Sequence, residues 1–151
     1  MLIFLDIDGV MVPATSWKAP HNLEDGMPMF TQKSIDALNS LISNNTTIIL
    51  STSHRSRFTI DEWRNIFERR GVKINKLGSL EPNPNLLKSR KDEILEWFRT
   101  NNVVEDYVII DDDTRLNDLP KSLKERLILT SSTVGLTPDH ISNLRERLHF
   151  A

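Results

Sequence analysis

Two carboxylates stand two residues apart near the start of the chain, at Asp6 and Asp8, and Gly9 follows them. Alternate residues of a strand point to the same side, so both carboxylates can lie together at a strand's end. Two neighbouring acids repel each other and lose hydration on burial, which a bound cation offsets. All-oxygen ligands favour a hard ion, and Mg²⁺ is the ion we expect. The alternative is a solvated acidic junction between a strand and a loop.

A second group of acids, Asp111, Asp112 and Asp113, occupies a similar position later in the chain. Each group follows an uncharged run, residues 2–5 and 107–110, typical of a strand buried on both faces of a parallel sheet. Three consecutive carboxylates after such a strand are hard to explain by structure alone. Because open α/β sheets bind ligands at the carboxyl ends of their strands, we expect both groups to contribute to one site.

A hydroxyl-rich stretch, residues 51–53, follows the β-branched run 46–50. Hydroxyl and backbone N–H donors at such a strand end can stabilise charge that develops on a transferred group. Arg55 is a candidate phosphate or substrate contact through its bidentate fork. We expect His54 to be a surface residue of the loop rather than a ligand. Turns and helix caps offer an alternative role for the hydroxyls.

Basic residues gather at the start of a further predicted helix, where Ser89 is the expected N-cap: Lys88, Arg90 and Lys91. The helix dipole disfavours cations in the first turn of a helix. Basic residues placed there against this preference indicate a functional role. A solvated basic turn is the alternative.

The four stretches, in this order, resemble the four motifs of the haloacid dehalogenase-like (HAD) phosphatases. The first motif has the form of an apolar run followed by D-x-D-G-V, and the fourth an apolar run followed by D-D. The resemblance implies that Asp6 is a nucleophile that forms an aspartyl-phosphate and that Asp8 is a general acid and base. It also implies an Mg²⁺ site formed by Asp6, the backbone carbonyl of Asp8, and Asp111 or Asp112. Asp113 extends the family pattern, with fixing the loop as its expected role.

The second and third motifs leave the register open. We favour the Thr52 hydroxyl and the Ser53 amide as phosphoryl donors, because T-S-x-R resembles the family's T-[GS]-x-R, although any of the three hydroxyls fits. For the cation that bridges nucleophile and phosphoryl group we favour Lys91, with Arg90 and then Lys88 as alternatives. Arg90 is also a candidate substrate contact.

Within the superfamily the chain resembles small capless HAD domains associated with RNA repair. The resemblance rests on S-T-S-H-R, S-R-K-D-E-I, Y-V-I-I-D-D-D and V-G-L-T, and R-K-D is similar to polynucleotide 3′-phosphatase domains. His54 departs from the Trp or Gly expected there. The implied activity is Mg²⁺-dependent hydrolysis of a phosphomonoester on a nucleic-acid end or a nucleotide. The alternatives are a phosphatase of a small metabolite or phosphoprotein, and a non-catalytic phosphate-binding module.

The periodicity predicts one α/β domain over residues 1–151, with alternating strands and helices and a doubly wound parallel sheet. Strands are expected at 2–5, 46–50, 72–77, 107–110 and 126–130, and helices near 32–43, 60–70, 90–100 and from 138, with a turn region at 116–124. The resemblance implies five strands in the order 5-4-1-2-3. Residues 10–30 are too short for a cap domain and are expected to form a flap, with Trp17 and Phe30 packing rather than contacting a base.

Composition is ordinary for a globular protein, with 38% hydrophobic and 26% charged residues, no cysteine and a net charge of −2. With no apolar span and no export signal, we expect a cytoplasmic protein that does not enter membranes. Between His54 and Lys91 there are ten basic and four acidic residues. Such a surplus suits a phosphorylated or polymeric substrate, although solvated helix faces account for it equally well. The oligomeric state is open, and a monomer is compatible with the sequence.

Overall fold

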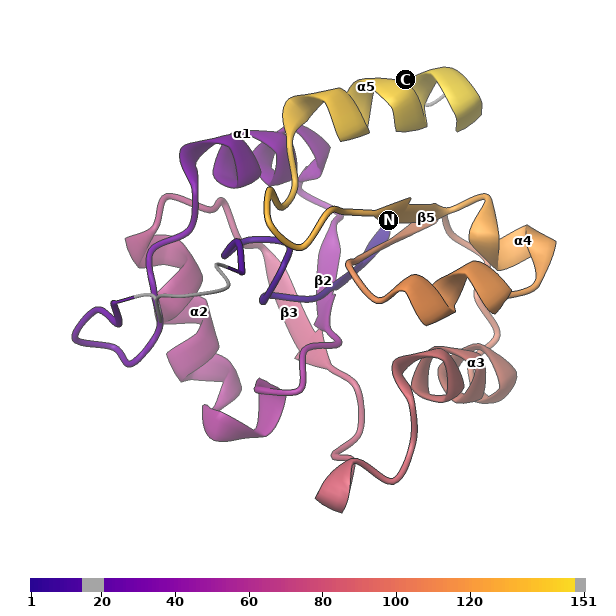
Figure 1. The fold of residues 1–151 in the computed structure, drawn as a ribbon, viewed down its shortest axis with the longest axis horizontal. Helices are drawn as coiled ribbons and strands as arrows, with labels where there is room; N and C mark the ends of the chain where they lie inside the picture. The colour runs from indigo at the N-terminus through magenta and orange to yellow at the C-terminus, as the bar shows by residue number, and fades with distance from the viewer. Residues whose placement is uncertain (15–20, 149–151) are drawn as a thin grey trace.

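A five-stranded parallel sheet forms the centre of the protein (Figure 1), of which a computed structural model describes residues 1–14 and 21–148. Its strands are β1 (Leu2–Leu5), β2 (Thr47–Leu50), β3 (Lys76–Ser79), β4 (Tyr107–Asp111) and β5 (Leu127–Leu129). All neighbours pair in parallel, in the order β3-β2-β1-β4-β5. This confirms the predicted topology and places β1 at the centre, between β2 and β4.

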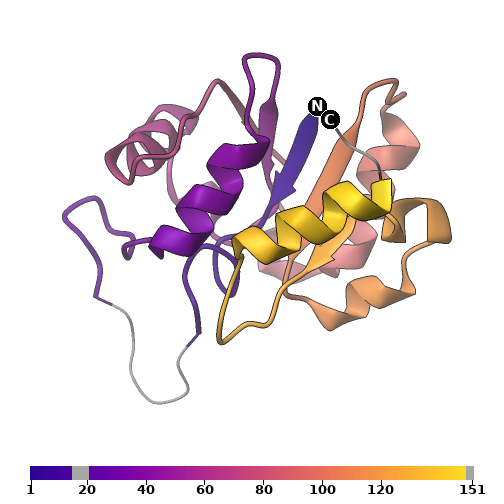
Figure 2. The same cartoon turned by 90° about the horizontal axis from the view of Figure 1, so that it is seen from above.

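Helices cover both faces of the sheet. They are α1 (Gln32–Leu41), α2 (Ile60–Arg69), α3 (Arg90–Thr100), α4 (Lys121–Lys124) and α5 (Pro138–Leu148), with short 3₁₀ turns η1 (Arg55–Arg57), η2 (Pro84–Leu86) and η3 (Thr114–Asp118). Figure 2 shows α1 and α5 side by side across one face of the sheet. The helix α3, the turn η3 and the helix α4 pack on the opposite face. The result is a three-layer α/β sandwich.

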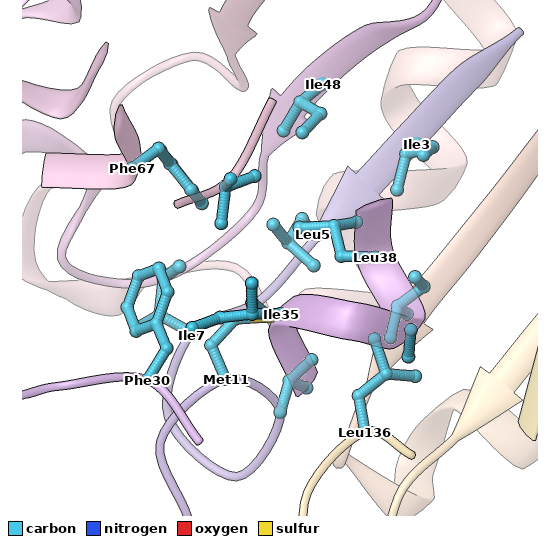
Figure 3. Packing of buried hydrophobic residues seen from close by; sticks show 14 of the residues in the cluster. Ile3, Leu5, Ile7, Met11, Phe30, Ile35, Leu38, Ile48, Phe67 and Leu136 are labelled. Atoms are coloured by element: carbon cyan, nitrogen blue, oxygen red, sulfur yellow. The ribbon is translucent and has the colours of Figure 1, made fainter. Parts of the chain in front are cut away.

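The buried strands sort their side chains between two apolar clusters. On one face Ile3 and Leu5 pack with residues of α1, α2 and α5, and Figure 3 shows part of this cluster. On the other face Leu2 and Phe4 pack with Ile94 of α3. Because side chains alternate along a strand, the residue that follows β1 on the Phe4 side points toward α3. That residue is Asp6, so the face occupied by α3 is the face that carries the site.

The third strand is where the predicted and observed boundaries differ most. The apolar run 72–77 predicts a strand, but β3 pairs with β2 from Lys76 to Ser79. Val72 is instead buried in the core as the chain leaves α2, and its N–H donates to the carbonyl of Phe67. The strand β3 lies at the sheet's edge, where an exposed, partly polar strand is stable without a long apolar run. The predicted turn region 116–124 contains η3 and the short helix α4.

Residues 21–30, the described stretch that leads into α1, are anchored to the body by Arg70 at the end of α2. Its guanidinium donates to the carbonyls of Met27 and Pro28 at 2.7 and 2.8 Å, and it forms a 2.6 Å ion pair with Asp25. Phe30 is buried in the core, as predicted for a packing role. Trp17 lies outside the described residues, and a flap formed by 10–30 stays a prediction.

Candidate active site

The register of the three central strands places their carboxyl ends at one level. Leu5 pairs with Leu50 on one side and with Ile110 on the other. The residues that follow these three, Asp6, Ser51 and Asp111, are therefore neighbours, and all three are buried. The three buried strands of this parallel sheet thus place two carboxylates and a hydroxyl at their carboxyl ends, on the side of the sheet that α3 covers.

Asp112 completes an acidic cluster with Asp6 and Asp111. One ligand atom from each of the three side chains lies within 4.8 Å of the other two. Asp112 is half-buried, whereas Asp6 and Asp111 are almost fully buried. Three converging carboxylate oxygens are a donor set that suits a hard cation such as Mg²⁺.

Arg90, in the first turn of α3, is the cation closest to this cluster. It forms an ion pair with Oδ2 of Asp111, and its Nη1 lies 3.6 Å from Oδ1 of Asp6. The other oxygen of Asp111 accepts the N–H groups of Asp112 and Asp113 at 2.8 and 3.0 Å. Asp111 is therefore held from two sides. Asp113 caps η3 by accepting the N–H of Arg115, which agrees with its expected role in fixing the loop.

The charges of the cluster remain unbalanced without a further cation. Burial raises the pKa of Asp6 well above its usual range, the neighbouring Asp111 raises it further, and Arg90 opposes the rise. Burial also raises the pKa of Asp111, again against the effect of Arg90. Three ionised carboxylates and one guanidinium leave two negative charges, which a divalent cation would neutralise. The residues present fit such an ion.

The structure brings Arg90, rather than the favoured Lys91, to the acids. Lys91 is half-buried and has no ion-pair partner in the described part of the chain, and Lys88 is exposed. Successive residues of an α-helix point about 100° apart, so only one of two neighbours can face the sheet edge. Arg90 also lies 3.6 Å from Glu93, one turn further along α3.

The three hydroxyls of the second stretch have different surroundings. Thr52 is buried, and its Oγ1 accepts the N–H of His54 at 3.2 Å. Ser53 is exposed. Ser51 is fully buried, and its Oγ finds no hydrogen-bond partner among the described residues. The favoured pair, the Thr52 hydroxyl and the Ser53 amide, stays a prediction, and Ser51 is the hydroxyl level with Asp6.

Arg55 is occupied by the protein itself. Its guanidinium donates to the carbonyls of Thr52 and Glu81 at 3.0 and 2.6 Å, and to that of Leu80 at 3.2 Å. It also forms an ion pair with Glu93, and the side chain is 4% exposed. A phosphate contact would have to break this network, so the structure favours a bracing role for Arg55 over the substrate contact that the sequence predicts.

His54 contacts Asp8, which the sequence did not predict. Its Nε2 lies 2.7 Å from Oδ2 of Asp8, whose side chain is largely exposed and lies outside the acidic cluster. His54 does lie in the loop with its side chain 31% exposed, as expected, and its contact with Asp8 is an addition to that expectation. The only signal in the sequence was the departure from the Trp or Gly of similar domains. The two partners are 46 positions apart in the sequence, so no local pattern reveals their contact.

The basic surplus between His54 and Lys91 does not form one exposed patch. Three of the ten form ion pairs within the protein: Arg55 and Arg70, which are buried, and Arg90, whose side chain is 12% exposed. This part of the surplus stabilises the fold and the acidic cluster, which weakens the argument from charge for a polymeric substrate.

A parallel 3-2-1-4-5 sheet with two acid-bearing strand ends beside a helical cation defines a small HAD domain. Comparison with known protein families matches residues 2–141 to the HAD domain in Swiss Army Knife RNA repair proteins. The chain belongs to this family. Neither a comparison with characterised proteins nor one with solved structures gave a match. No helix in residues 1–14 and 21–148 is long and apolar enough to cross a membrane.

Proposed function

We propose that the protein is an Mg²⁺-dependent phosphomonoester hydrolase that works through an aspartyl-phosphate on Asp6. The observation that carries the proposal is the position of this carboxylate. It is buried at the end of the central strand, in one cluster with Asp111 and Asp112 and 3.6 Å from Arg90. A cluster of carboxylates with a raised pKa at a strand end is typical of a functional site.

In the first step a carboxylate oxygen of Asp6 attacks phosphorus in line while the bond to the leaving oxygen breaks. Asp8 gives its proton to that oxygen. In the second step Asp8 takes a proton from water, which attacks phosphorus, releases phosphate and restores Asp6. When held by Asp6, Asp111 and Asp112, Mg²⁺ supplies positive charge that lets one anion approach another. We expect the Thr52 hydroxyl and the Ser53 amide to stabilise charge on the equatorial oxygens in the same way, together with Arg90 or Lys91.

For the substrate we propose a phosphorylated nucleic-acid end or nucleotide. The family's association with RNA repair supports this class. A phosphatase of a small metabolite or phosphoprotein, and a phosphate-binding module without turnover, are the competing functions. The buried acidic cluster favours an enzyme, because its unbalanced charge is costly in a domain that only binds phosphate.

The test is phosphate release with Mg²⁺ from a 3′-phosphorylated oligonucleotide, a 5′-phosphorylated one and an aryl phosphate. Wild type is compared with Asp6→Asn and with Asp118→Asn, an exposed carboxylate of η3. Oligonucleotide turnover far above that of the aryl ester, abolished only by Asp6→Asn, supports the full proposal. Turnover of the aryl ester alone keeps the chemistry and rejects the substrate class. Absence of turnover on all three in folded protein favours the binding module.

A further inference from the structure

His54 is held in place by its own turn. Its N–H donates to Oγ1 of Thr52 at 3.2 Å, and its carbonyl accepts the N–H of Arg57 at 2.9 Å. The next residue, Arg55, is buried and braced against Glu93 of α3. Trp63 of α2 adds a further tie, because its indole N–H donates to the Arg55 carbonyl at 3.0 Å. The imidazole therefore projects from a rigid support.

The ring lies between a donor and an acceptor. A guanidinium only donates, so Arg57 Nη1, which lies 3.5 Å from Nδ1, favours Nδ1 as the acceptor. The proton of a neutral imidazole then sits on Nε2, which lies 2.7 Å from Oδ2 of Asp8. One carboxylate oxygen is thereby tied down. The other, Oδ1, is left to carry the proton that a general acid transfers.

We propose that His54 is a positioning residue that holds the carboxyl of Asp8 in the orientation needed for proton transfer to the leaving group. This inference rests on the proposed function, in which Asp8 is the general acid. Asp8 needs such a partner because its side chain is 60% exposed and sits outside the acidic cluster. Holding an exposed side chain in one rotamer removes an entropy cost from each turnover.

The test uses the dependence of kcat/KM on the leaving group, since this constant reports the steps up to transfer of phosphorus to Asp6. A series of aryl monoesters and one alkyl monoester is compared in wild type, His54→Phe and His54→Gln. Help from a general acid matters most for poor leaving groups. His54→Phe should therefore lower kcat/KM about tenfold or more on the alkyl ester, and about threefold or less on the most reactive aryl ester. His54→Gln, whose amide can still donate to Asp8, should recover most of the loss.

The matched control is Ser56→Ala, an exposed neighbour in the same turn, which should leave the leaving-group dependence unchanged. Equal losses across the series in His54→Phe, or no loss, would overturn the positioning role while the proposed function stands. If wild type shows no turnover, or if Asp6→Asn turns over as fast as wild type, the proposed function and this inference are overturned together.

A second measurement does not depend on activity. In protein labelled with ¹⁵N-histidine, the neutral form of the His54 imidazole should carry its proton on Nε2 and not on Nδ1. Asp8→Ala should abolish this preference by removing the acceptor. An unprotonated Nε2 in wild type would overturn the hydrogen bond on which the inference depends.

Discussion

Gly9 and Asp112 approach so closely that a Cβ atom on Gly9 would lie 2.0 Å from Oδ2 of Asp112. The backbone of Gly9 also has a φ of +79°, a conformation that glycine adopts without strain. The turn after β1 and the acidic end of β4 thus fit together only because residue 9 has no side chain. The absence of a side chain at residue 9 leaves room for the Asp112 carboxylate in the cluster.

We expect Gly9→Ala to displace Asp112 and weaken Mg²⁺ binding about tenfold or more, with a backbone strain of about 1–3 kcal/mol. Calorimetric titration with Mg²⁺ measures the affinity, and thermal unfolding measures the strain. Gly78→Ala is the control, because nothing lies within 4 Å of the Cβ it would add. Unchanged Mg²⁺ affinity in Gly9→Ala would show that Asp112 does not hold the ion.

Arg90 and Lys91 can be separated by their effects on turnover. Arg90→Ala should lower kcat/KM about 100-fold or more, as removal of a donor to developing charge does. Lys91→Ala should stay within about threefold of wild type, because Lys91 is half-buried without an ion-pair partner among the described residues, and a lysine away from the acids contributes little to such charge. Steady-state kinetics on the best substrate decides between them. A larger loss in Lys91→Ala would restore the first choice from the sequence.

Metal-free Asp6→Asn should be more stable than metal-free wild type at neutral pH. Because the pKa of Asp6 is raised in the fold, its contribution to stability is present at acidic pH and is lost as the pH rises through that pKa. Asparagine does not ionise and escapes the loss. We expect a gain of about 1 kcal/mol, or about 3 °C in Tm, with EDTA at pH 7.

The gain in Asp6→Asn should shrink toward pH 4, and Mg²⁺ should raise the Tm of wild type more than that of the variant. Differential scanning fluorimetry with EDTA or Mg²⁺ measures both effects, with Asp118→Asn as the exposed control. A metal-free Asp6→Asn less stable than wild type at pH 7 would contradict the electrostatic account.

Arg55→Ala should destabilise the fold rather than only weaken substrate binding. Loss of one partner of a buried ion pair costs about 3–5 kcal/mol, and here it also strips several carbonyls of their donor. Urea unfolding of Arg55→Lys, which keeps the charge but not the fork, should show a partial loss. Arg57→Ala, an exposed neighbour, should stay within about 0.5 kcal/mol. Wild-type stability combined with a raised KM in Arg55→Ala would assign it to the substrate after all.

The architecture could be predicted because it follows from local signals. Dry strands that end in acids, such as 2–5 and 107–110, indicate both the sheet and the edge at which a site forms. The order of the strands came from the resemblance to a family. The boundaries of β3 could not be predicted, because the apolar residue Val72 packs in the core before the strand begins.

Contacts between distant segments were beyond the sequence. The choice between Arg90 and Lys91 depends on how α3 is rotated about its axis. Side chains of neighbouring helix residues point about 100° apart, and the sequence does not say which of them faces the acids. Distant partners of Arg55, such as Leu80, and the partner of His54, Asp8, lie in loops far away in the sequence, and no local pattern encodes them. The residue types at the site were therefore predictable, while their pairing needed the fold.

Glu93 links two parts of the candidate site. Its carboxylate forms an ion pair with Arg55, which follows the hydroxyl-rich stretch 51–53, and it lies 3.6 Å from Arg90 in α3. Effects of substitutions at these positions should therefore fail to add in a double-mutant cycle. Among relatives we expect covariation, with Glu93 replaced only where Arg55 is replaced as well. A single acid would then restrict which substitutions two separate stretches of the sequence can accept.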